Sequence, residues 1–566
     1  MKIKANLILV LIIAIYIFIA AMSMYQYYVG DEVLDVTCAK AITQNGFPIT
    51  PYGAEMPDYK CEHHIPLYRY ILAGIISVFG DNIYLIKSFM MMFNVLTVIL
   101  IYLITKEILK ENHHKDYWAL AAVCLYIFNP LTLINSIIVE PDGSLVNFGL
   151  TLFLYLFVKK KNYFFLFPAL LFIFFSKEIG PIVLFASLFL FYLITKNYKK
   201  IPSIFLLFLG AGIITGITWF IYTLFAKFDF LMFFKFNFGA AQKNFNLVNI
   251  LTSLWTQKLF VYFAVPFFIL LFLILTVLFY RKAIKNKDFL KNEENKNILL
   301  MNLFALVVLL IYFYVGDSSY GFIKYQDIAM PAISIFIISM LSKSNIFEYL
   351  KSKKLIKTFL VLILILSTFF ILFVKNPLIP EFDETRTNVN ISEVINPVMI
   401  NFSLYFLIPF VFTFSFLFVK LKKLRAALLV SLLLLTMFAY FYIDVVHMTA
   451  DYSTHFKYGD TGKKEVLEYL KENNISAWQV ITHINIGYYL NLSEYHEIVF
   501  THYRDNPELF KKEYAENEDI KYLIIWNRDI SKFGENIKYF ELEKQIGSYY
   551  IYKKIQNSSL SSYNSV

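Results

Sequence analysis

Apolar runs long enough to cross a lipid bilayer recur along the chain from its first residues to about residue 443. A membrane-spanning helix needs about 20 predominantly apolar residues. On this basis we predict about thirteen spanning helices. The predicted spans are 7–24, 84–105, 117–138, 144–158, 163–175, 180–195, 201–225, 259–280, 298–315, 328–341, 358–374, 400–419 and 426–443.

The composition supports a membrane protein and excludes several other classes. Hydrophobic residues make up 58% of the 566-residue chain and charged residues only 17%, far from the values of a typical soluble domain. An ordinary soluble enzyme, a disordered protein, a coiled coil and a disulfide scaffold are therefore excluded. The net charge of +10 does not indicate a nucleic-acid partner, because the basic residues lie in short clusters between apolar runs.

The loops between the predicted spans alternate in charge. If the N-terminus is cytoplasmic, every loop that then faces the cytoplasm is rich in lysine, whereas the other loops hold more acidic and aromatic residues. The lysine-rich loops are 106–115, 159–161, 196–200, 281–296, 343–357 and 420–425. The positive-inside rule therefore predicts a multi-pass protein of the cell membrane with a cytoplasmic N-terminus and an external C-terminus. We interpret the first span as an anchor, because it is long for a signal peptide and no A-x-A site follows it.

The sequence changes character after residue 443, where charge increases and the apolar runs become short. We predict helices at 462–474 and 507–516 there, and strands at 478–482, 498–501, 522–526 and 549–553. The predicted fold class is a polytopic α-helical membrane protein with a small extracytoplasmic α/β C-terminal domain. Its predicted parts are a transmembrane domain (1–443) with interfacial helices in the first outer loop (25–83), the α/β domain (444–556) and a disordered tail (557–566).

The three cysteines leave two possibilities open. Cys38 and Cys61 share the first outer loop, where they could form a disulfide outside the cytoplasm or remain as two free thiols. Cys124 lies within a predicted span, and we expect it to contribute to packing.

Two polar clusters lie in the first outer loop. Asp31 and Glu32 follow the first span, and they either have a chemical role or begin a helix that runs to about residue 44. Glu62, His63 and His64 precede the amphipathic stretch 70–79, which fits an interfacial helix. Glu62 and His63 could ligate a divalent metal ion, the one cofactor that the sequence suggests; a hydrated loop would contain the same residues.

Three further clusters lie at the predicted outer ends of later spans. Asp142 belongs to a Glu-Pro-Asp-Gly sequence, which also makes a tight turn unaided. Lys177 lies between two short apolar runs, and Lys324 and Tyr325 precede another span. Cations at this depth could bind a lipid phosphate or the headgroup region in general.

The order of these clusters resembles the GT-C superfamily of membrane glycosyltransferases, above all the protein O-mannosyltransferase and aminoarabinose transferase group. That group has an Asp-Glu pair in the first outer loop, a His/Lys-Pro-Pro-Leu-Tyr helix, a second span that an arginine begins, a second acid in the next outer loop and a late Arg-Tyr…Pro motif. The matching residues here are Asp31, Glu32, the segment from His64 to Tyr68, Asp142, Lys324, Tyr325 and Pro331.

The sequence also departs from the pattern of that group. Ile65 replaces a proline, and Lys87 and Lys324 replace arginines. The lysines keep the positive charge but lose the planar bidentate fork of arginine. The resemblance extends to about residue 341, and beyond it only the architecture is shared.

The resemblance implies transfer of a sugar from a dolichyl or undecaprenyl phosphate to a hydroxyl of a protein or glycolipid at the external face, with inversion. It implies Asp31 as the general base, supported by Glu32 and Asp142. The residues implied for the donor phosphate are Lys177, Lys324, Arg69, His64 and Tyr325. A transporter or flippase of a lipid-linked precursor is the alternative function, and a non-catalytic scaffold is a third.

Overall fold

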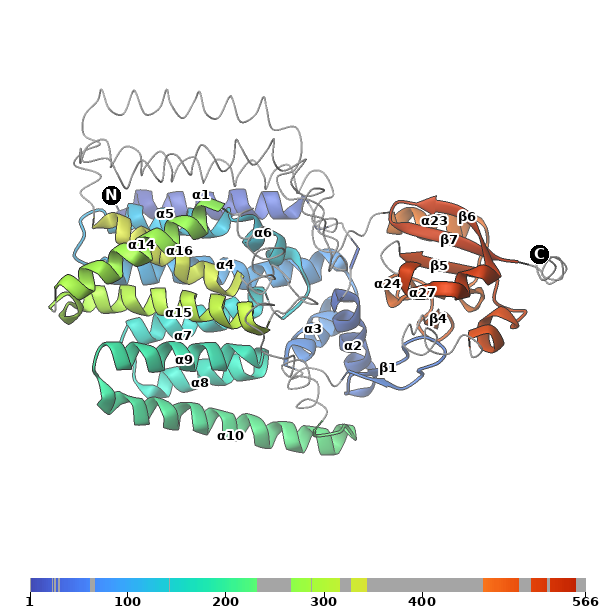
Figure 1. The fold of residues 1–566 in the computed structure, drawn as a ribbon, viewed down its shortest axis with the longest axis horizontal. Coiled ribbons are helices and arrows are strands. Elements are labelled where there is room, and N and C mark those ends of the chain that lie inside the picture. The colour runs from blue at the N-terminus through green and yellow to red at the C-terminus, as the bar shows by residue number, and fades with distance from the viewer. Residues whose placement is uncertain are drawn as a thin grey trace, which may run out of the picture.

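The computed structural model describes residues 2–22, 24, 27–28, 31–61, 67–141, 143–231, 266–286, 288–315, 327–343, 462–497, 510–526 and 530–555. Figure 1 shows a large stack of helices and a smaller unit built around a sheet, with α2 and α3 between them. The helices of the stack are α1 (Lys2–Ala21), α4 (Ile83–Ile108), α5 (Lys115–Ile127), α6 (Pro130–Ile137), α7 (Ser144–Val158), α8 (Tyr163–Ser176), α9 (Ile179–Ile194), α10 (Ile201–Ala226), α14 (Pro266–Lys285), α15 (Glu293–Val315) and α16 (Met330–Ser342).

The helices of the stack have the length and composition expected in a membrane. Within the described residues, three apolar stretches are long enough to cross a bilayer: Ile83–Ile108, Tyr198–Ala226 and Glu293–Ile311. Several shorter apolar helices lie beside them. These helices support a membrane location. The predicted spans 358–374, 400–419 and 426–443 lie outside the described residues, so the predicted number of thirteen stays a prediction.

The helices of the stack differ in how much of their apolar surface is buried against other helices. α16 is buried along the whole stretch from Met330 to Leu341, as expected of a helix that is apolar all round and enclosed by others. By contrast, only 28% of the apolar window of Tyr198–Ala226 is buried. The exposed apolar side chains of α10 are therefore available to lipid.

The prediction of one continuous span at 117–138 is wrong. The structure divides this segment into α5, which ends at Ile127, and α6, which begins at Pro130. Proline has no N–H for a helical hydrogen bond and disfavours the helical conformation of the residue before it. The break brings the buried side chain of Asn129 between the two helices.

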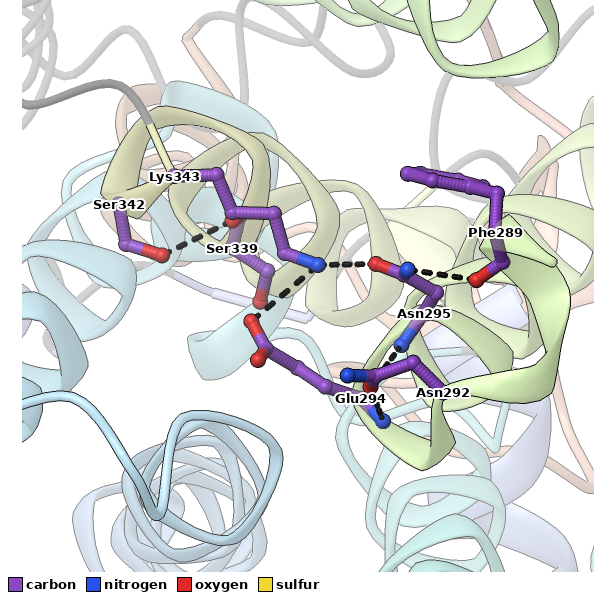
Figure 2. Close-up of polar contacts among 7 residues, drawn as sticks. All are labelled: Phe289, Asn292, Glu294, Asn295, Ser339, Ser342 and Lys343. Atoms are coloured by element: carbon purple, nitrogen blue, oxygen red, sulfur yellow. Dashed lines mark hydrogen bonds and ion pairs between the residues drawn. The ribbon is translucent and has the colours of Figure 1, made fainter. Parts of the chain in front are cut away.

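Several predicted cytoplasmic loops meet at one end of the stack. Figure 2 shows Lys343, which follows α16, bonded to Asn295 and paired with Glu294 at the start of α15, the latter at 3.3 Å. Burial lowers the pKa of Lys343, and the charge of Glu294 opposes this shift. Lys160 pairs with Glu293 at 3.1 Å. The loops between α7 and α8, between α14 and α15, and after α16 therefore lie on the same side.

The predicted first outer loop folds into two helices and a small hairpin. α2 (Asp31–Asn45) and α3 (Leu67–Phe79) pack on each other, and β1 (Ile49–Thr50) pairs antiparallel with β2 (Tyr59–Lys60). The predicted helix that begins at Asp31 and the predicted helix over 70–79 are both confirmed. Cys38 and Cys61 form a disulfide, which decides between the two possibilities that the sequence left open.

The C-terminal residues form a five-stranded sheet with the order β4-β3-β5-β7-β6. β3 is parallel to β4 and β5, whereas β7 is antiparallel to β5 and β6. Its strands are β3 (Val480–Thr482), β4 (His496–Glu497), β5 (Tyr522–Trp526), β6 (Phe540–Ile546) and β7 (Tyr549–Lys554), with helices α23 (Lys463–Glu472), α24 (Ile484–Gly487) and α27 (Ile530–Phe533).

The sequence predicted part of this sheet. The predicted strands 522–526 and 549–553 correspond to β5 and β7. The predicted strand 478–482 begins too early, because Ala477–Gln479 form a 3-10 turn that a capping box starts. The predicted helix 507–516 is a π-helical turn, Lys511–Ala515, within its described part. β6 was not predicted, because its charged side chains lie exposed along a sheet edge.

Candidate functional site

The predicted acids of the first outer loop lie where the helix stack meets α2. Asp31 is the first residue of α2, and Glu32 is only 4% exposed. The Glu32 carboxylate accepts a hydrogen bond from the Val139 N–H at 2.7 Å. This bond attaches the start of α2 to the α6–α7 connection, which contains Asp142. The structure thus brings together the segments that carry the three predicted catalytic acids. The side chain of Asp31 and the whole of Asp142 lie outside the described residues.

A buried carboxylate that the sequence analysis did not select lies next to this connection. Asp327 precedes α16 and is 1% exposed. Its carboxylate accepts hydrogen bonds from Thr132 of α6 at 2.7 Å and from Asn147 of α7 at 2.8 Å. Asp327 therefore fixes the two helices on either side of the α6–α7 connection. The signal was present in the sequence, since this acid closes the same cluster as Lys324 and Tyr325.

Arg69 has protein partners for its guanidinium group. Its Nε donates to Asp35 Oδ1 at 2.8 Å and its Nη1 donates to the Cys61 carbonyl at 2.7 Å. The side chains of Arg69 and Asp35 are 4% and 8% exposed. The contacts join α2, α3 and the disulfide-bonded loop into one unit. The sequence predicted a donor phosphate as the partner of Arg69, and the structure adds this internal ion pair.

Two buried lysines lie at the same end of the stack. Lys177 follows α8 and is 8% exposed, and Lys87 of α4 is 2% exposed. Lys87 Nζ lies 6.0 Å from the ring centroid of Tyr28. Phe172, which is five residues before Lys177, packs on the apolar cluster that includes Tyr28. Lys87 therefore borders the segment that leads into α2.

Two tyrosine hydroxyl groups in this region have no hydrogen-bond partner within the part of the chain that the structure describes. They belong to Tyr28 and to Tyr68 of α3, each of which is 2% exposed. The charge of Glu32 acts on both side chains. Buried hydroxyls normally have a partner, so each of these two is a candidate to bond a polar molecule or a protein group outside the described residues.

The other predicted site residues lie outside the described residues. They are Glu62, His63, His64, Lys324 and Tyr325. The proposed metal ligands Glu62 and His63 therefore stay a prediction. Among the residues that the structure does describe, no group of three His, Cys, Asp or Glu side chains is arranged to hold a metal ion.

The C-terminal unit contacts this region through α24 and α23. Tyr489 accepts a hydrogen bond from the Tyr28 N–H at 2.8 Å, and Lys463 donates to the Tyr28 carbonyl at 2.7 Å. Tyr488 donates to Asp81 at 3.0 Å. Burial raises the pKa of both Tyr488 and Tyr489, so their hydroxyls stay protonated. No local pattern in the sequence indicated these contacts, because the partners are hundreds of residues apart.

A second junction joins the β1–β2 hairpin to the sheet. Glu55 Oε1 lies 2.8 Å from His496 Nδ1 and accepts from the Tyr514 hydroxyl at 3.1 Å. Burial alone would raise the pKa of Glu55, but hydrogen bonds from His496 and from the Glu497 amide outweigh it and lower that pKa. Burial raises the pKa of Glu497 far above its usual value, although a hydrogen bond from Tyr495 opposes this.

Comparison with known proteins agrees with the resemblance that the motifs indicated. Residues 63–222 match the family model of dolichyl-phosphate-mannose-protein mannosyltransferases. No curated protein matches the sequence. The fold is similar to that of ArnT from Cupriavidus metallidurans bound to undecaprenyl phosphate, with a TM-score of 0.59, 10% sequence identity, and coverage of 97% of this chain and 98% of ArnT.

Two further solved structures are similar. ArnT from the same organism in the apo state gives a TM-score of 0.59 at 10% identity and covers 98% of both chains. The oligosaccharyltransferase of Archaeoglobus fulgidus, in complex with Zn and sulfate, gives 0.46 at 13% identity, with coverage of 95% of this chain and 72% of that one. The predicted resemblance is therefore confirmed: the chain is similar to the mannosyltransferase and ArnT group, and it has the fold of ArnT.

Proposed function

From this likeness we propose that the chain is a membrane glycosyltransferase that moves a sugar from a polyprenyl phosphate to a hydroxyl acceptor at the external face, with inversion. The observation that carries the proposal is the Glu32–Val139 hydrogen bond. In a chain with the fold of ArnT, this bond brings the Asp31–Glu32 pair beside the connection that contains Asp142. The unpartnered hydroxyls of Tyr28 and Tyr68 add groups that a substrate could engage.

The proposed reaction is a single displacement. Asp31 takes the proton of the acceptor hydroxyl as its oxygen bonds to the anomeric carbon. The bond from that carbon to the phosphate oxygen breaks, and its electron pair stays on the phosphate. Fixed cations stabilise the developing charge most where water is excluded. We assign this role to Lys177 and Lys324, and we propose His64 and Tyr325 as further groups that bind the donor phosphate. The guanidinium group of Arg69 already donates to Asp35 and to the Cys61 carbonyl.

The proposed function is tested directly by product release without a membrane gradient. Purified protein in detergent, supplied with a polyprenyl-phosphate sugar and a hydroxyl acceptor, is expected to release polyprenyl phosphate. A flippase would move the donor lipid in vesicles and release none. No release with any polyprenyl-phosphate sugar, together with transport in vesicles, would contradict the proposal.

We also propose the predicted topology, with about thirteen spans, a cytoplasmic N-terminus and an external α/β domain. The Cys38–Cys61 disulfide supports an oxidising compartment for the first outer loop. The lysine-rich loops that adjoin α7, α15 and α16 meet at one side, which agrees with the positive-inside rule for cytoplasmic loops.

Cysteine labelling in intact cells tests this topology. In a Cys124→Ala background we expect Glu472→Cys to react with a membrane-impermeant thiol reagent and Lys291→Cys to be protected. Both positions are exposed, so protection of one of them reports its side of the membrane. After permeabilisation both should react. Labelling of position 291 alone in intact cells would mean that the orientation is inverted.

Removal of the proposed phosphate-binding lysines should weaken use of the donor. Lys177→Ala and Lys324→Ala are each expected to reduce kcat/KM for the donor by a factor that corresponds to about 1–3 kcal/mol of lost transition-state stabilisation, as for a charge-assisted hydrogen bond. Initial rates against donor concentration at saturating acceptor measure the effect. Lys200→Ala, at an exposed position in a predicted cytoplasmic loop, is the matched control. Unchanged donor dependence in both variants would refute the assignment.

A further inference from the structure

Two residues of the C-terminal unit hold the backbone of Tyr28 from both sides. Its N–H donates to the Tyr489 hydroxyl at 2.8 Å, across 461 sequence positions. Its carbonyl accepts from Lys463 Nζ at 2.7 Å, across 435 positions. Because the donor and the acceptor of this peptide segment are both engaged, its position is set by the C-terminal unit.

The contact between Tyr28, Lys463 and Tyr489 is buried, and the three residues lie close together. Tyr28 is 2% exposed and Lys463 is 4% exposed. The Lys463 ammonium lies 5.9 Å from the ring centroid of Tyr489, and that ring meets Tyr27 edge to face at 4.8 Å. A buried ammonium group is costly unless its protons have acceptors. The Tyr28 carbonyl is therefore a specific partner of Lys463 rather than an incidental neighbour.

The start of α23, which carries Lys463, is itself fixed. Gly462 precedes it with a φ of 86°, in the left-handed region that favours glycine. A Cβ atom at this position would come within 2.7 Å of the Ile546 carbonyl oxygen. No other residue fits here without moving the β6–β7 turn. Lys463 therefore reaches Tyr28 from a rigid support.

Tyr28 lies three residues before Asp31, the first residue of α2. We propose that Lys463 and Tyr489 are positioning residues, which hold Tyr28 and thereby set the place of Asp31 for proton transfer. The inference rests on the proposed function, because it assigns Asp31 as the base. It adds a role for the C-terminal unit: completing the alignment of the proposed active site without contacting the sugar.

The full-length chain with single substitutions tests this role. Tyr489→Phe removes the hydroxyl that accepts from Tyr28 but keeps the ring, and Lys463→Ala removes the ammonium. Lys463→Arg keeps a donor and is the rescue variant. Tyr488→Phe is the matched control, since its hydroxyl donates to Asp81 across the same junction but not to Tyr28.

We expect Tyr489→Phe and Lys463→Ala to lower kcat about 10- to 100-fold with an unchanged donor KM, because misplacing a catalytic group by about 1 Å can cost about 100-fold in rate. Lys463→Arg and Tyr488→Phe should stay near wild type. Hydrogen–deuterium exchange of the Tyr28 amide should accelerate in Tyr489→Phe and not in Tyr488→Phe.

Three outcomes would overturn the inference. They are an unchanged kcat in both variants, an equal loss in Tyr488→Phe, and unchanged exchange of the Tyr28 amide in Tyr489→Phe. Failure of the proposed function is distinguishable, since the wild-type protein would then release no polyprenyl phosphate. Accelerated exchange in Tyr489→Phe would in that case still support the anchoring of Tyr28 by the C-terminal unit.

Discussion

Asp31→Asn is expected to lower turnover by about 100-fold or more, the usual scale for loss of general-base catalysis. Asparagine has nearly the same shape as aspartate but cannot take the acceptor proton. The fold should survive, because asparagine is also favoured at helix N-termini and the lost charge contributes only about 0.3–1 kcal/mol there. The measurement is kcat for release of polyprenyl phosphate, with thermal unfolding of the same preparation as a check on folding.

Glu32→Gln is the matched control for this variant. The glutamine amide oxygen can still accept the hydrogen bond from Val139, so we expect a much smaller loss of turnover. Full activity of Asp31→Asn would remove Asp31 from the mechanism. The assignment of the base would then move to Asp142, or to Glu32 if Glu32→Gln proves inactive.

Arg69→Met should destabilise the protein by about 3–5 kcal/mol, because it leaves the Asp35 carboxylate buried and unpaired. Both side chains are less than one tenth exposed, and the Cys61 carbonyl also loses its donor. The double variant Arg69→Met with Asp35→Leu removes both charges and should recover most of the loss. Denaturant unfolding in a fixed detergent measures the three free energies of unfolding.

The same three proteins separate two roles of Arg69. If the double variant regains both stability and turnover, Arg69 acts through Asp35 and does not bind the donor. If it regains stability but not turnover, the guanidinium also contacts the donor phosphate, as the sequence predicted. Wild-type stability of Arg69→Met alone would mean that the buried ion pair is not a determinant of the fold.

Local patterns made much of the helical part predictable. The apolar runs correspond to helices such as α4, α9 and α15. A long run that is apolar throughout, whether it faces protein or lipid, is typical of a membrane helix. The acids at the start of α2 and the amphipathic pattern of α3 also marked real helices. The break before Pro130 was present in the sequence too, since proline interrupts a helix wherever it falls.

The contacts that build the candidate site were not predictable from local patterns. The family resemblance suggested Arg69 as a phosphate-binding cation. Its partner Asp35 is 34 positions away, and only the packing of α2 on α3 brings them together. Asp327 was visible as an acid near a span, yet its bonds to Thr132 and Asn147 depend on three helices meeting. The Tyr28 contacts depend on a sheet formed by the last hundred or so residues.

The junction of Glu55 with His496 also has a consequence for the order of events during synthesis. The two residues are 441 positions apart. At a synthesis rate of about 5–20 residues per second, His496 is therefore made roughly 20–90 s after Glu55. The Cys38–Cys61 bond can form in the first moments of this delay, because both cysteines emerge early. The disulfide keeps the nascent loop closed until the end of translation, when the surface on which the hairpin docks has been synthesised. Closing this loop contributes about 3 kcal/mol of stability in a chain-entropy estimate.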